Sequence, residues 1–460
     1  MPHLSQLFLD ELLRILPAEQ VITDVASRWP YGGDNSRRHV LPDVVVFPVS
    51  HEEVARIVTL CAAHRVPVVA RGRGTATTGA SVPVAGGLVL STERLNRILA
   101  LDPDNRTITV QPGVTNLEVQ QAAARYGFFW PPDPTSAAVC TVGGNLACNS
   151  AGPRAVKYGT TRDNVLGLRF VTGTGSAMHS GVHTTKGVVG YDLTRLLIGS
   201  EGTLAIITEA ILKLTPLPEA TRTLRALYRD IGSAARAVSR IMAQPVTPCA
   251  LEFMDGNAVE LIRERLPTAL PAECQALLMI EVDGAAEELE RSIQAVSRAA
   301  EGDGCLEIRS APSIEESASL WEARKALSPA LRAIAPKKIN EDVVVPVSRI
   351  PALINGVAAL GQRYGITIVN FGHAGNGNIH VNLLVDPDDP AQMQHAEPCL
   401  DEIFSLVLSL DGTLSGEHGI GLVKREFVAR ELEPAAITLM HAIKDQFDPF
   451  HILNPQKTLP

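Results

Sequence analysis

The sequence lacks two features that exported and membrane-spanning chains carry. No uninterrupted apolar run in its 460 residues reaches the length that a transmembrane helix needs. The N-terminal segment MPHLSQLFLDELLRILPAEQ has acidic residues within an amphipathic helical pattern, and it has neither the basic start nor the cleavage site of a signal peptide. We therefore expect a cytoplasmic protein with no transmembrane segment.

The sequence also has few cysteines and no excess of positive charge. Its seven cysteines are scattered, without the spacing of a CxxC pair or a ferredoxin motif, which predicts reduced thiols and argues against an intrinsic iron–sulfur cluster. With 41 Lys and Arg against 50 Asp and Glu, the formal charge is -9 at pH 7. This acidic balance argues against a nucleic-acid partner and provides no polybasic membrane anchor.

The chain is long enough to bury more than one core. At 460 residues with 45% hydrophobic content, it should form two or three domains. Closely spaced prolines in residues 214–218 predict a boundary, because proline ends regular structure and stiffens a linker. Beyond it, strand and helix patterns alternate from about residue 223 to residue 309, which suggests a ferredoxin-like α+β layer, and residues 434–447 predict a closing helix.

A glycine-rich loop follows the first predicted buried strand. Residues 52–64 predict an amphipathic helix and residues 66–70 a short strand, after which Arg71 to Ser81 read RGRGTATTGAS. The backbone N–H groups and arginines of such a loop suit a pyrophosphate. A Rossmann loop or P-loop runs strand, loop, helix, whereas here a second strand follows near residues 87–90 and no GKS or GKT occurs. NAD and NTP sites are therefore disfavoured, and a long polar turn is an equal alternative.

More loops of small residues follow this one. Glycines concentrated over about 100 residues suggest backbone lying against a large flat ligand, because only glycine lets the main chain approach so closely. The loops are QPGV from Gln111, WPPDPTS from Trp130, TVGGN from Thr141, NSAG from Asn149, KYG from Lys157 and IGSEGTL from Ile198.

A predicted β-hairpin over residues 366–385 carries two histidines. Its strands flank Asn376-Gly377, the dipeptide that favours a two-residue type I′ turn. This turn would place His373 directly opposite His380 on one face, with Cβ atoms about 4.5–5.5 Å apart, close enough to share a ligand. Phe371 would pair with Asn382 on the same face. A polar surface pair is the alternative to a metal site.

The segment SGEHGIG, residues 415–421, supplies a third candidate ligand. Glycines around Glu417 and His418 make a tight turn whose side chains must diverge, so one can reach a metal while the other faces a substrate. Two imidazoles and one carboxylate form an open divalent-metal set that suits zinc, manganese or iron. Solvated charges at a glycine-rich turn are the alternative interpretation.

Taken together, these motifs resemble the FAD-linked D-2-hydroxyacid dehydrogenases of the vanillyl-alcohol-oxidase type. The motifs are RGRGT, QPGV, PPDPTS, TVGGN, KYG, IGSEGTL, GHAGNGNIH, SGEHGIG and FDPFHILNP. The family includes D-lactate dehydrogenases, the flavin subunit of glycolate oxidase and D-2-hydroxyglutarate dehydrogenase. The resemblance implies an α+β fold with a two-subdomain FAD-binding domain of the PCMH type and a ferredoxin-like cap. We expect a helical segment at 1–40, the FAD domain at 41–218, the cap at 219–425 and a C-terminal segment returning to the FAD domain at 426–460.

The resemblance also implies a role for each matching residue. His418 would be the catalytic base, and His373, His380 and Glu417 would hold the divalent metal, zinc before manganese or iron. Arg324 in the motif WEAR would clamp the substrate carboxylate, with Ser328, Lys338 and Asn382 as further substrate contacts. FAD would contact Arg71, Gly72, Arg73, Gly74, Thr75, Thr78, Gly79, Pro134, Thr135, Ser136, Gly143, Gly144, Ser150, Ala151, Gly152, Glu201, Gly202, Ile207 and Asn454.

The sequence departs from the family pattern in two loops. Residues 74–80 have extra hydroxyls where GTGLSGG is usual, and CNSAG at residues 148–152 stands where NAGG is common. These changes bear on individual flavin contacts. No histidine occupies the PPDPTS or arginine-glycine loop, positions where relatives often attach flavin covalently, so we expect noncovalent FAD.

The expected reaction is oxidation of a small D-2-hydroxyacid to the 2-oxoacid, with hydride transfer to flavin N5. D-lactate is the first candidate substrate, followed by glycolate and D-2-hydroxyglutarate. The electron acceptor would be a quinone, a cytochrome, an electron-transfer flavoprotein or an iron–sulfur subunit, any of which could place the protein at the inner membrane, and a homodimer is an option. The alternatives are a flavin-dependent alkyl transferase and a noncatalytic flavin subunit of a complex.

Overall fold

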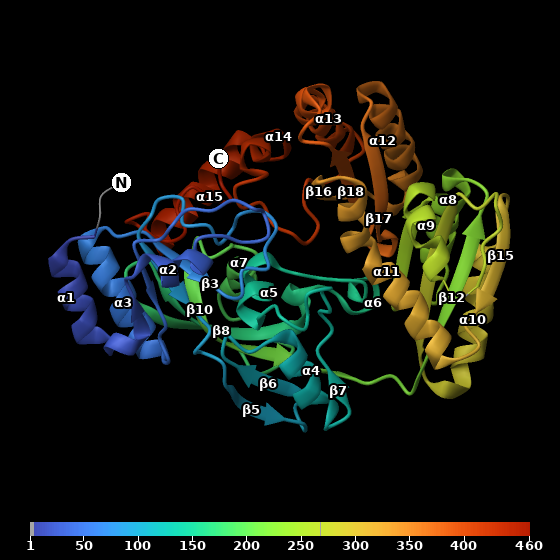
Figure 1. The fold of residues 1–460 in the computed structure, drawn as a ribbon. Helices are drawn as coiled ribbons and strands as arrows, with labels where there is room; N and C mark the ends of the chain where they lie inside the picture. Colours follow the sequence, from blue (N-terminus) through green and yellow to red (C-terminus); the bar gives the residue numbers. More distant parts are fainter. Residues whose placement is uncertain (1–3, 267) are drawn as a thin grey trace. The chain divides into compact units, whose positions relative to one another are not determined.

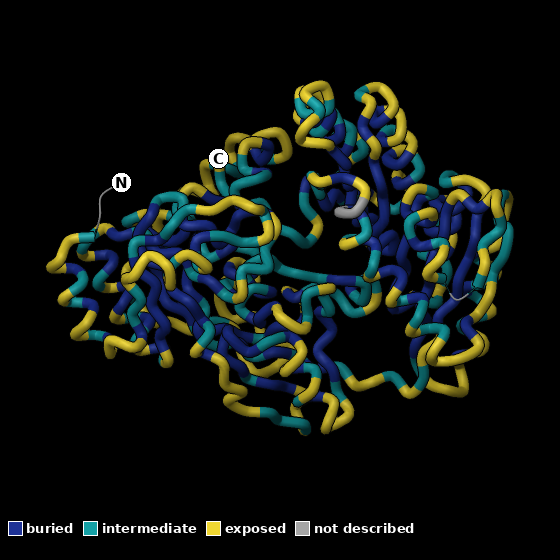
Figure 2. The backbone as a smooth tube through the Cα atoms, viewed as in Figure 1, coloured by how far each residue is buried: buried dark blue, intermediate teal, exposed yellow. Residues whose placement is uncertain are grey.

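The computed structural model describes residues 4–266 and 268–460, which form two compact units (Figure 1). The first unit comprises the chain up to Ala151 together with Gly159–Leu217 and Glu417–Pro460, and the second comprises Gly152–Tyr158 and Pro218–Gly416. In both units the central strands are largely buried, while several edge strands and the outer faces of the helices carry exposed positions (Figure 2). Within the described ranges, no helix combines the length and apolarity required to cross a membrane.

The first unit begins with a small sheet that has helices against it. Strands β2, β4 and β3 are parallel, and β1 is antiparallel to β2. Val44 and Val46 pack into a core with helices α1 and α3, while Val45 packs on the other face. Because both faces are covered, the strand can be apolar throughout. The elements are α1 (Gln6–Ile15), β1 (Val21–Ile22), α2 (Val25–Arg28), β2 (Val44–Val46), α3 (His51–His64), β3 (Val68–Arg71) and β4 (Leu88–Ser91).

A five-stranded antiparallel sheet forms the second layer of this unit, in the order β5-β6-β10-β8-β9. Trp130 is fully buried in its core and donates from Nε1 to the carbonyl oxygen of Asn164 at 3.1 Å. The strands are β5 (Ile98–Asp102), β6 (Thr107–Val110), β8 (Val165–Thr172), β9 (Ala177–Gly181) and β10 (Ala205–Lys213), with the pair β7 (Phe128–Phe129) and β11 (Thr215–Pro216). The helices are α4 (Asn116–Ala124), α5 (Val142–Cys148) and α7 (Leu193–Leu197).

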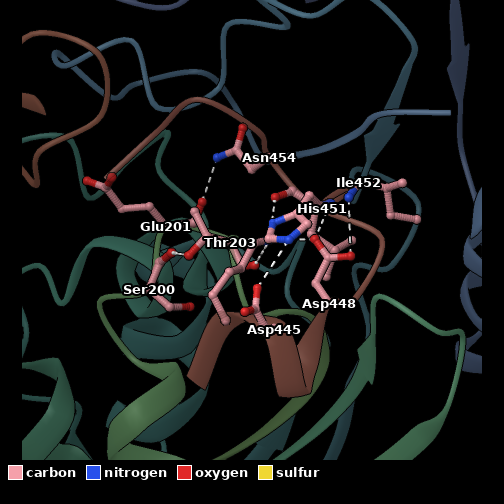
Figure 3. A network of polar contacts seen from close by, with 10 residues as sticks. Ser200, Glu201, Thr203, Asp445, Asp448, His451, Ile452 and Asn454 are labelled. Atoms are coloured by element: carbon pink, nitrogen blue, oxygen red, sulfur yellow. Dashed lines mark hydrogen bonds and ion pairs between the residues drawn. The ribbon is translucent and has the colours of Figure 1, made fainter. Parts of the chain in front are cut away.

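The C-terminal segment is anchored to the same unit by a buried ion pair. It contains α14 (Val428–Glu431) and α15 (Pro434–Phe447). Lys444 pairs with Asp448 and donates to the carbonyl oxygens of Thr203 at 2.6 Å and Leu453 at 3.0 Å. Asp448 in turn accepts the backbone N–H of Ile452 at 3.2 Å (Figure 3) and that of Leu453 at 2.7 Å. This arrangement places Leu453 beside Val68, so the tail borders β3.

The second unit is built on one seven-stranded antiparallel sheet, ordered β15-β12-β14-β13-β17-β18-β16. The first four strands, with α8 and α10, form the β-α-β-β-α-β pattern of a ferredoxin-like layer. Helices α9 and α11 pack on one core that includes Met254 and Leu277. The strands are β12 (Ala220–Tyr228), β13 (Ala250–Asp255), β14 (Ala276–Gly284), β15 (Cys305–Ser310), β16 (Lys337–Val344), β17 (Thr367–His373) and β18 (Asn378–Val385). The helices are α6 (Ala155–Tyr158), α8 (Ile231–Ala243), α9 (Gly256–Ile262), α10 (Ala286–Ala300), α11 (Ile314–Ile334), α12 (Ile350–Tyr364) and α13 (Pro390–Ser409).

Candidate functional site

The buried side chain of Arg71 fixes the conformation of the loop that follows β3. Its guanidinium is buried and donates to the carbonyl oxygens of Gly33 at 2.5 Å and Pro30 at 3.1 Å. Gly74 has φ +65°, and a Cβ there would collide with the Arg71 guanidinium, so the position requires glycine. Arg73 lies at the surface and pairs with Glu93 at 3.2 Å. Arg71 therefore stabilises the loop from its buried side. The groups of the loop that can face a ligand are its backbone and its small side chains.

The start of helix α5 lies against this loop. A Cβ on Gly72 would come within 2.5 Å of Thr141 Oγ1, the side chain that caps α5 by accepting the N–H of Gly144 at 3.3 Å. One turn later, the Asn145 amide nitrogen is buried and has no hydrogen-bond partner among the described residues. A buried donor without an acceptor is costly, and a ring carbonyl of a flavin would satisfy it. The donor thus fits a flavin at the glycine loops.

The neighbouring predicted flavin segments also meet. The carbonyl oxygen of Ala151 accepts the N–H of Asp133 at 3.0 Å, which joins the PPDPTS turn to NSAG. Ser150 accepts the N–H of Thr161 through its carbonyl oxygen at 3.1 Å. The predicted Gly152 is the first residue of the second unit, and Ile207 lies in β10 opposite Phe170.

Glu201 holds the loop that carries His418. Its carboxylate is buried and accepts the N–H groups of Ile420 at 2.6 Å and Gly421 at 2.8 Å, and the hydroxyl of Thr458 at 2.5 Å. Burial raises the pKa of the Glu201 carboxyl, and these three donors oppose the rise. Asn454 fixes the Glu201 backbone from the other side, donating to its carbonyl oxygen at 2.6 Å (Figure 3). All of these side chains belong to the first unit.

The glycine-rich loop reaches the same segment. Thr78 donates its hydroxyl to the carbonyl oxygen of His418 at 3.4 Å, and its own carbonyl oxygen accepts the N–H of Leu422 at 2.8 Å. A Cβ on Gly79 would approach the Leu422 side chain at 3.0 Å. The structure thus brings Thr78, Glu201, His418 and Asn454 together, although they span nearly 380 residues of sequence.

The hairpin β17–β18 has a register that differs from the predicted one. His373 pairs with Asn378, and Phe371 pairs with His380, so the prediction of His373 opposite His380 and Phe371 opposite Asn382 is wrong by two residues. The connection is a four-residue loop, 374–377, that ends with Gly377 at φ +76°. The neighbouring strand sets this length: Val345 donates its N–H to the Gly377 carbonyl at 3.1 Å, and Asn378 donates its side-chain N–H to Val343 at 3.1 Å.

Both histidines nevertheless share one face, because a shift of two residues preserves side-chain parity. Their ring centroids are 5.3 Å apart and the rings are nearly perpendicular. His373, His380 and Glu417 each offer a ligand atom, and these atoms all lie within 4.8 Å of one another. Zinc binds nitrogen and oxygen donors at about 2.0–2.2 Å, so a small side-chain adjustment would close the set on an ion. The donor set fits a divalent metal.

Two acids that the sequence analysis did not single out support this set. Asp342 accepts the N–H of Gly416 at 2.8 Å and the hydroxyl of Ser415 at 3.2 Å, and Gly416 is bonded directly to Glu417. Glu252, in the middle of β13, accepts from Nδ1 of His373 at 2.6 Å. The available sequence signal was Glu252 inside the otherwise apolar run ALEFM, whereas Asp342 follows Glu341 in the polar segment KKINED and gave no such signal.

Three of the four predicted substrate residues fall into two hydrogen-bonded groups. Arg324 on α11 pairs with Glu252 at 2.7 Å and lies over the Phe371 ring, with 4.7 Å from its Cζ to the ring centroid. Desolvation raises the pKa of Glu252, but His373 and Arg324 outweigh it and lower that pKa to about 2. Separately, Lys338 donates to the Ser328 hydroxyl at 3.0 Å.

Asn382 is also buried in this sheet. Its side-chain oxygen accepts from Asn340 at 2.6 Å, and its nitrogen donates to the carbonyl oxygens of His380 and Val369 at 3.0 Å. Both amide N–H groups are therefore occupied by the strands around the histidines. The structure places Asn382 as a brace between β16, β17 and β18.

Family models match both parts of the chain. A model described as an FAD binding domain matches residues 42–181, and one described as the C-terminal domain of FAD linked oxidases matches residues 217–458. The chain belongs to the FAD-linked oxidase family. It is a flavoprotein and an oxidoreductase, as the resemblance predicted.

Curated relatives cover most of the chain. The glycolate oxidase subunit GlcD of Bacillus subtilis (strain 168) is 40% identical over 97% of this chain and 96% of its own length. GlcD of Escherichia coli (strain K12) is 35% identical over 94% of this chain and 86% of its own. The D-lactate dehydrogenase of Anaerostipes hadrus is 35% identical over 90% of this chain and 89% of its own.

Solved structures share the fold of this family member. A substrate-bound p-cresol methylhydroxylase matches with a TM-score of 0.79 at 16% identity, covering 99% of this chain and 97% of that one. An alkyldihydroxyacetonephosphate synthase matches with a TM-score of 0.77 at 21% identity, covering 99% and 85%. At these identities the likeness concerns fold alone, and it confirms the predicted FAD-binding fold of the PCMH type.

Proposed function

We propose that this flavoprotein oxidises a small D-2-hydroxyacid to the corresponding 2-oxoacid. D-lactate is the first candidate substrate, followed by glycolate and D-2-hydroxyglutarate. The observation that carries the proposal is that one carboxylate, Glu252, binds both a cation, Arg324, and a candidate metal ligand, His373. His380 and Glu417 complete the candidate metal-ligand set. A 2-hydroxyacid presents the matching groups, a carboxylate next to a hydroxyl. The names of the relatives, glycolate oxidase subunit and D-lactate dehydrogenase, point to the same substrate class.

Each residue has a distinct task in this proposal. Arg324 holds the substrate carboxylate through charge-assisted hydrogen bonds. His373, His380 and Glu417 hold a divalent metal, zinc before manganese or iron, which when bound supplies Lewis-acid polarisation of the 2-hydroxyl. His418 accepts the hydroxyl proton at its imidazole nitrogen, and histidine is the side chain that most often acts as a general base. Ser328 and Lys338 extend the contacts to the carboxylate.

The first unit holds FAD noncovalently, and FAD when bound supplies the hydride acceptor. The segments of this unit at 71–79, 134–136, 143–151 and 201–207, with Asn454, orient FAD by backbone N–H groups and small side chains, and Gly152 follows directly in the chain. The electron acceptor is a quinone, a cytochrome, an electron-transfer flavoprotein or an iron–sulfur subunit, and the word subunit in the relatives' names supports a protein partner.

The test is anaerobic mixing of the zinc-replete, FAD-loaded protein with D- and L-lactate, glycolate, and D- and L-2-hydroxyglutarate, with flavin absorbance recorded over time. One D-acid or glycolate should bleach the flavin, and a chelator should abolish the bleaching while FAD stays bound. His418→Ala should slow reduction by a factor of about 100 to 10,000, as expected for loss of a general base. His395→Ala, an exposed histidine on α13, is the matched control and should reduce at the wild-type rate.

Three outcomes would contradict parts of the proposal. Flavin reduction at the wild-type rate in His418→Ala would refute the base assignment. Reduction that survives complete metal removal would refute the metal role. Bound flavin that no 2-hydroxyacid reduces would refute the reaction itself and favour an alkyl transferase or a noncatalytic subunit.

A further inference from the structure

One buried carboxylate joins the two halves of the proposed substrate site. Glu252 is completely buried at the centre of β13, in the apolar run ALEFM. An ionised carboxylate persists at such a position only when charged or polar groups compensate its lost hydration. Glu252 has two compensating partners, and each binds a different oxygen: Arg324 binds Oε2, and His373 Nδ1 binds Oε1 at 2.6 Å.

The backbone ladder fixes the first of these bonds. Glu252 is directly opposite His373 in the antiparallel pairing of β13 with β17. Facing residues in such a ladder have Cβ atoms about 4.5–5.5 Å apart, so the carboxylate and the imidazole meet without any loop having to order. The residue next in line on that face, Phe371, carries the Arg324 guanidinium on its ring. One sheet face therefore positions both groups.

Glu252 determines which nitrogen of His373 can bind an ion. The bond to the carboxylate requires Nδ1 to carry the proton, which leaves the lone pair on Nε2. A metal-ligating histidine commonly has this arrangement, in which a carboxylate accepts from one nitrogen and the metal binds the other. The same carboxylate uses the Nε and one Nη2 hydrogen of Arg324, at 2.8 and 2.7 Å, so the Nη1 side of the fork remains to bind a second anion.

We propose that Glu252 is a positioning residue that sets the tautomer of His373 and the orientation of Arg324 at the same time. Through it, one metal ligand, His373, and the carboxylate clamp, Arg324, are held against the same face of the sheet of the second unit. This inference rests on the metal and clamp roles given under Proposed function.

The decisive variant is Glu252→Gln, which keeps the size and removes the charge. Arg324 only donates, so the amide oxygen must face it and the amide nitrogen must face His373. Nδ1 of His373 then has to accept, and the ring proton moves to Nε2, where it blocks ligation. The expected result is a zinc dissociation constant about 10- to 100-fold higher than in the wild type.

Zinc affinity is measured on FAD-loaded protein by competition with a chromophoric chelator. The tautomer is measured on zinc-free protein labelled with ¹⁵N-histidine, with His373→Gln used to assign the signal. The wild type should show the proton on Nδ1 of His373, and Glu252→Gln should show it on Nε2.

Glu281→Gln is the matched control. Glu281 is a buried acid on the adjacent strand β14, and its carboxylate accepts from Trp321 at 2.8 Å and Thr223 at 3.2 Å. Its substitution should leave both zinc affinity and the His373 tautomer unchanged. A loss of affinity equal to that of Glu252→Gln would overturn the proposal, because it would show a general effect of removing buried charge from this sheet.

A second variant keeps the test decisive if the Glu252→Gln protein does not fold because the buried charge of Arg324 has lost its counter-charge. Glu252→Met/Arg324→Met replaces both partners by apolar side chains, a change that buried ion pairs often tolerate. Without the carboxylate, His373 loses its preference for the Nδ1 proton, and zinc affinity should again fall about 10- to 100-fold. Wild-type zinc affinity in either folded variant would overturn the proposal.

The two readouts separate this inference from the proposed function. If the wild type reduces its flavin with a hydroxyacid and binds zinc, but Glu252→Gln binds zinc equally well, the positioning role fails and the function stands. If the wild type binds no zinc, the metal assignment fails, and the tautomer measurement on zinc-free protein still decides whether Glu252 orients His373.

Discussion

Removal of the Glu201 carboxylate should release the loop that carries Glu417 and His418. In Glu201→Ala, the N–H groups of Ile420 and Gly421 lose an acceptor at 2.6 and 2.8 Å. A buried donor left without a partner costs about 1–3 kcal/mol. Because Ile420 is only partly buried, water can satisfy part of its loss, and we expect about 2–4 kcal/mol for the pair.

Amide hydrogen exchange measures this effect locally. Since about 1.4 kcal/mol corresponds to a factor of ten, Ile420 and Gly421 should exchange roughly 30- to 1,000-fold faster in Glu201→Ala than in the wild type. Thr458→Val is the control, because it removes one donor to the same carboxylate and leaves both backbone bonds in place. In Thr458→Val, the exchange rates of the Ile420 and Gly421 amides should change by less than about tenfold, because a factor of ten corresponds to the free energy of about one ordinary hydrogen bond.

A folded Glu201→Ala protein with wild-type exchange at Ile420 and Gly421 would refute the anchoring role. FAD content provides a second comparison, because the resemblance assigned Glu201 to the flavin. Loss of FAD with unchanged loop protection would support flavin contact in place of loop anchoring. Faster loop exchange with FAD retained would support anchoring alone.

Two further predictions concern backbone geometry and pH. Gly377→Ala should lower stability by about 2–4 kcal/mol and weaken zinc binding, because the residue has φ +76° and its Cβ would collide with the Val345 carbonyl oxygen. Thermal unfolding should show a much smaller loss in Gly365→Ala, where φ is +64° but nothing lies within 4 Å of the new Cβ, and equal losses would contradict the steric argument. For Lys457, burial lowers the ammonium pKa from 10.5 to about 8, against the attraction of Glu201. The unfolded chain holds this proton up to higher pH than the folded protein, so wild-type stability should rise between pH 8 and pH 10.5 relative to Lys457→Met. At about 1.4 kcal/mol per pH unit, the gain over 2.5 units is roughly 3 kcal/mol, and a constant difference in urea denaturation across this range would refute the linkage.

Local sequence pattern determined most of the elements around the site. The closing helix was predicted at 434–447 and lies at Pro434–Phe447, since proline favours the first turn and the apolar positions repeat at helical spacing. Helix α3 and strands β3 and β4 lie within two residues of their predicted bounds. The alternation of strands and helices beyond residue 218 correctly indicated a ferredoxin-like layer, because periodicity is a local property that tertiary contacts reinforce.

The sequence also identified the histidines and Glu417, although the hairpin register was wrong. Asn376-Gly377 alone favours a two-residue turn, but Val343 in β16 and Val345 just after it form hydrogen bonds with Asn378 and Gly377 that accompany a longer connection. The register error of two residues did not change the predicted metal set, because side chains alternate between the two faces of a strand with a period of two. A shift of one residue would have placed His373 on the opposite face.

Only the tertiary structure could reveal what Glu252, Asp342 and Glu201 bind. Each of these acids binds a group at least 70 residues away in the chain: His373, Gly416 and Ile420 respectively. Such pairings depend on which strands become neighbours and in which register, and no periodicity within either segment records that choice. The sequence thus determined which residues we propose for the site, and the packing of distant strands determined which buried carboxylates hold them in place.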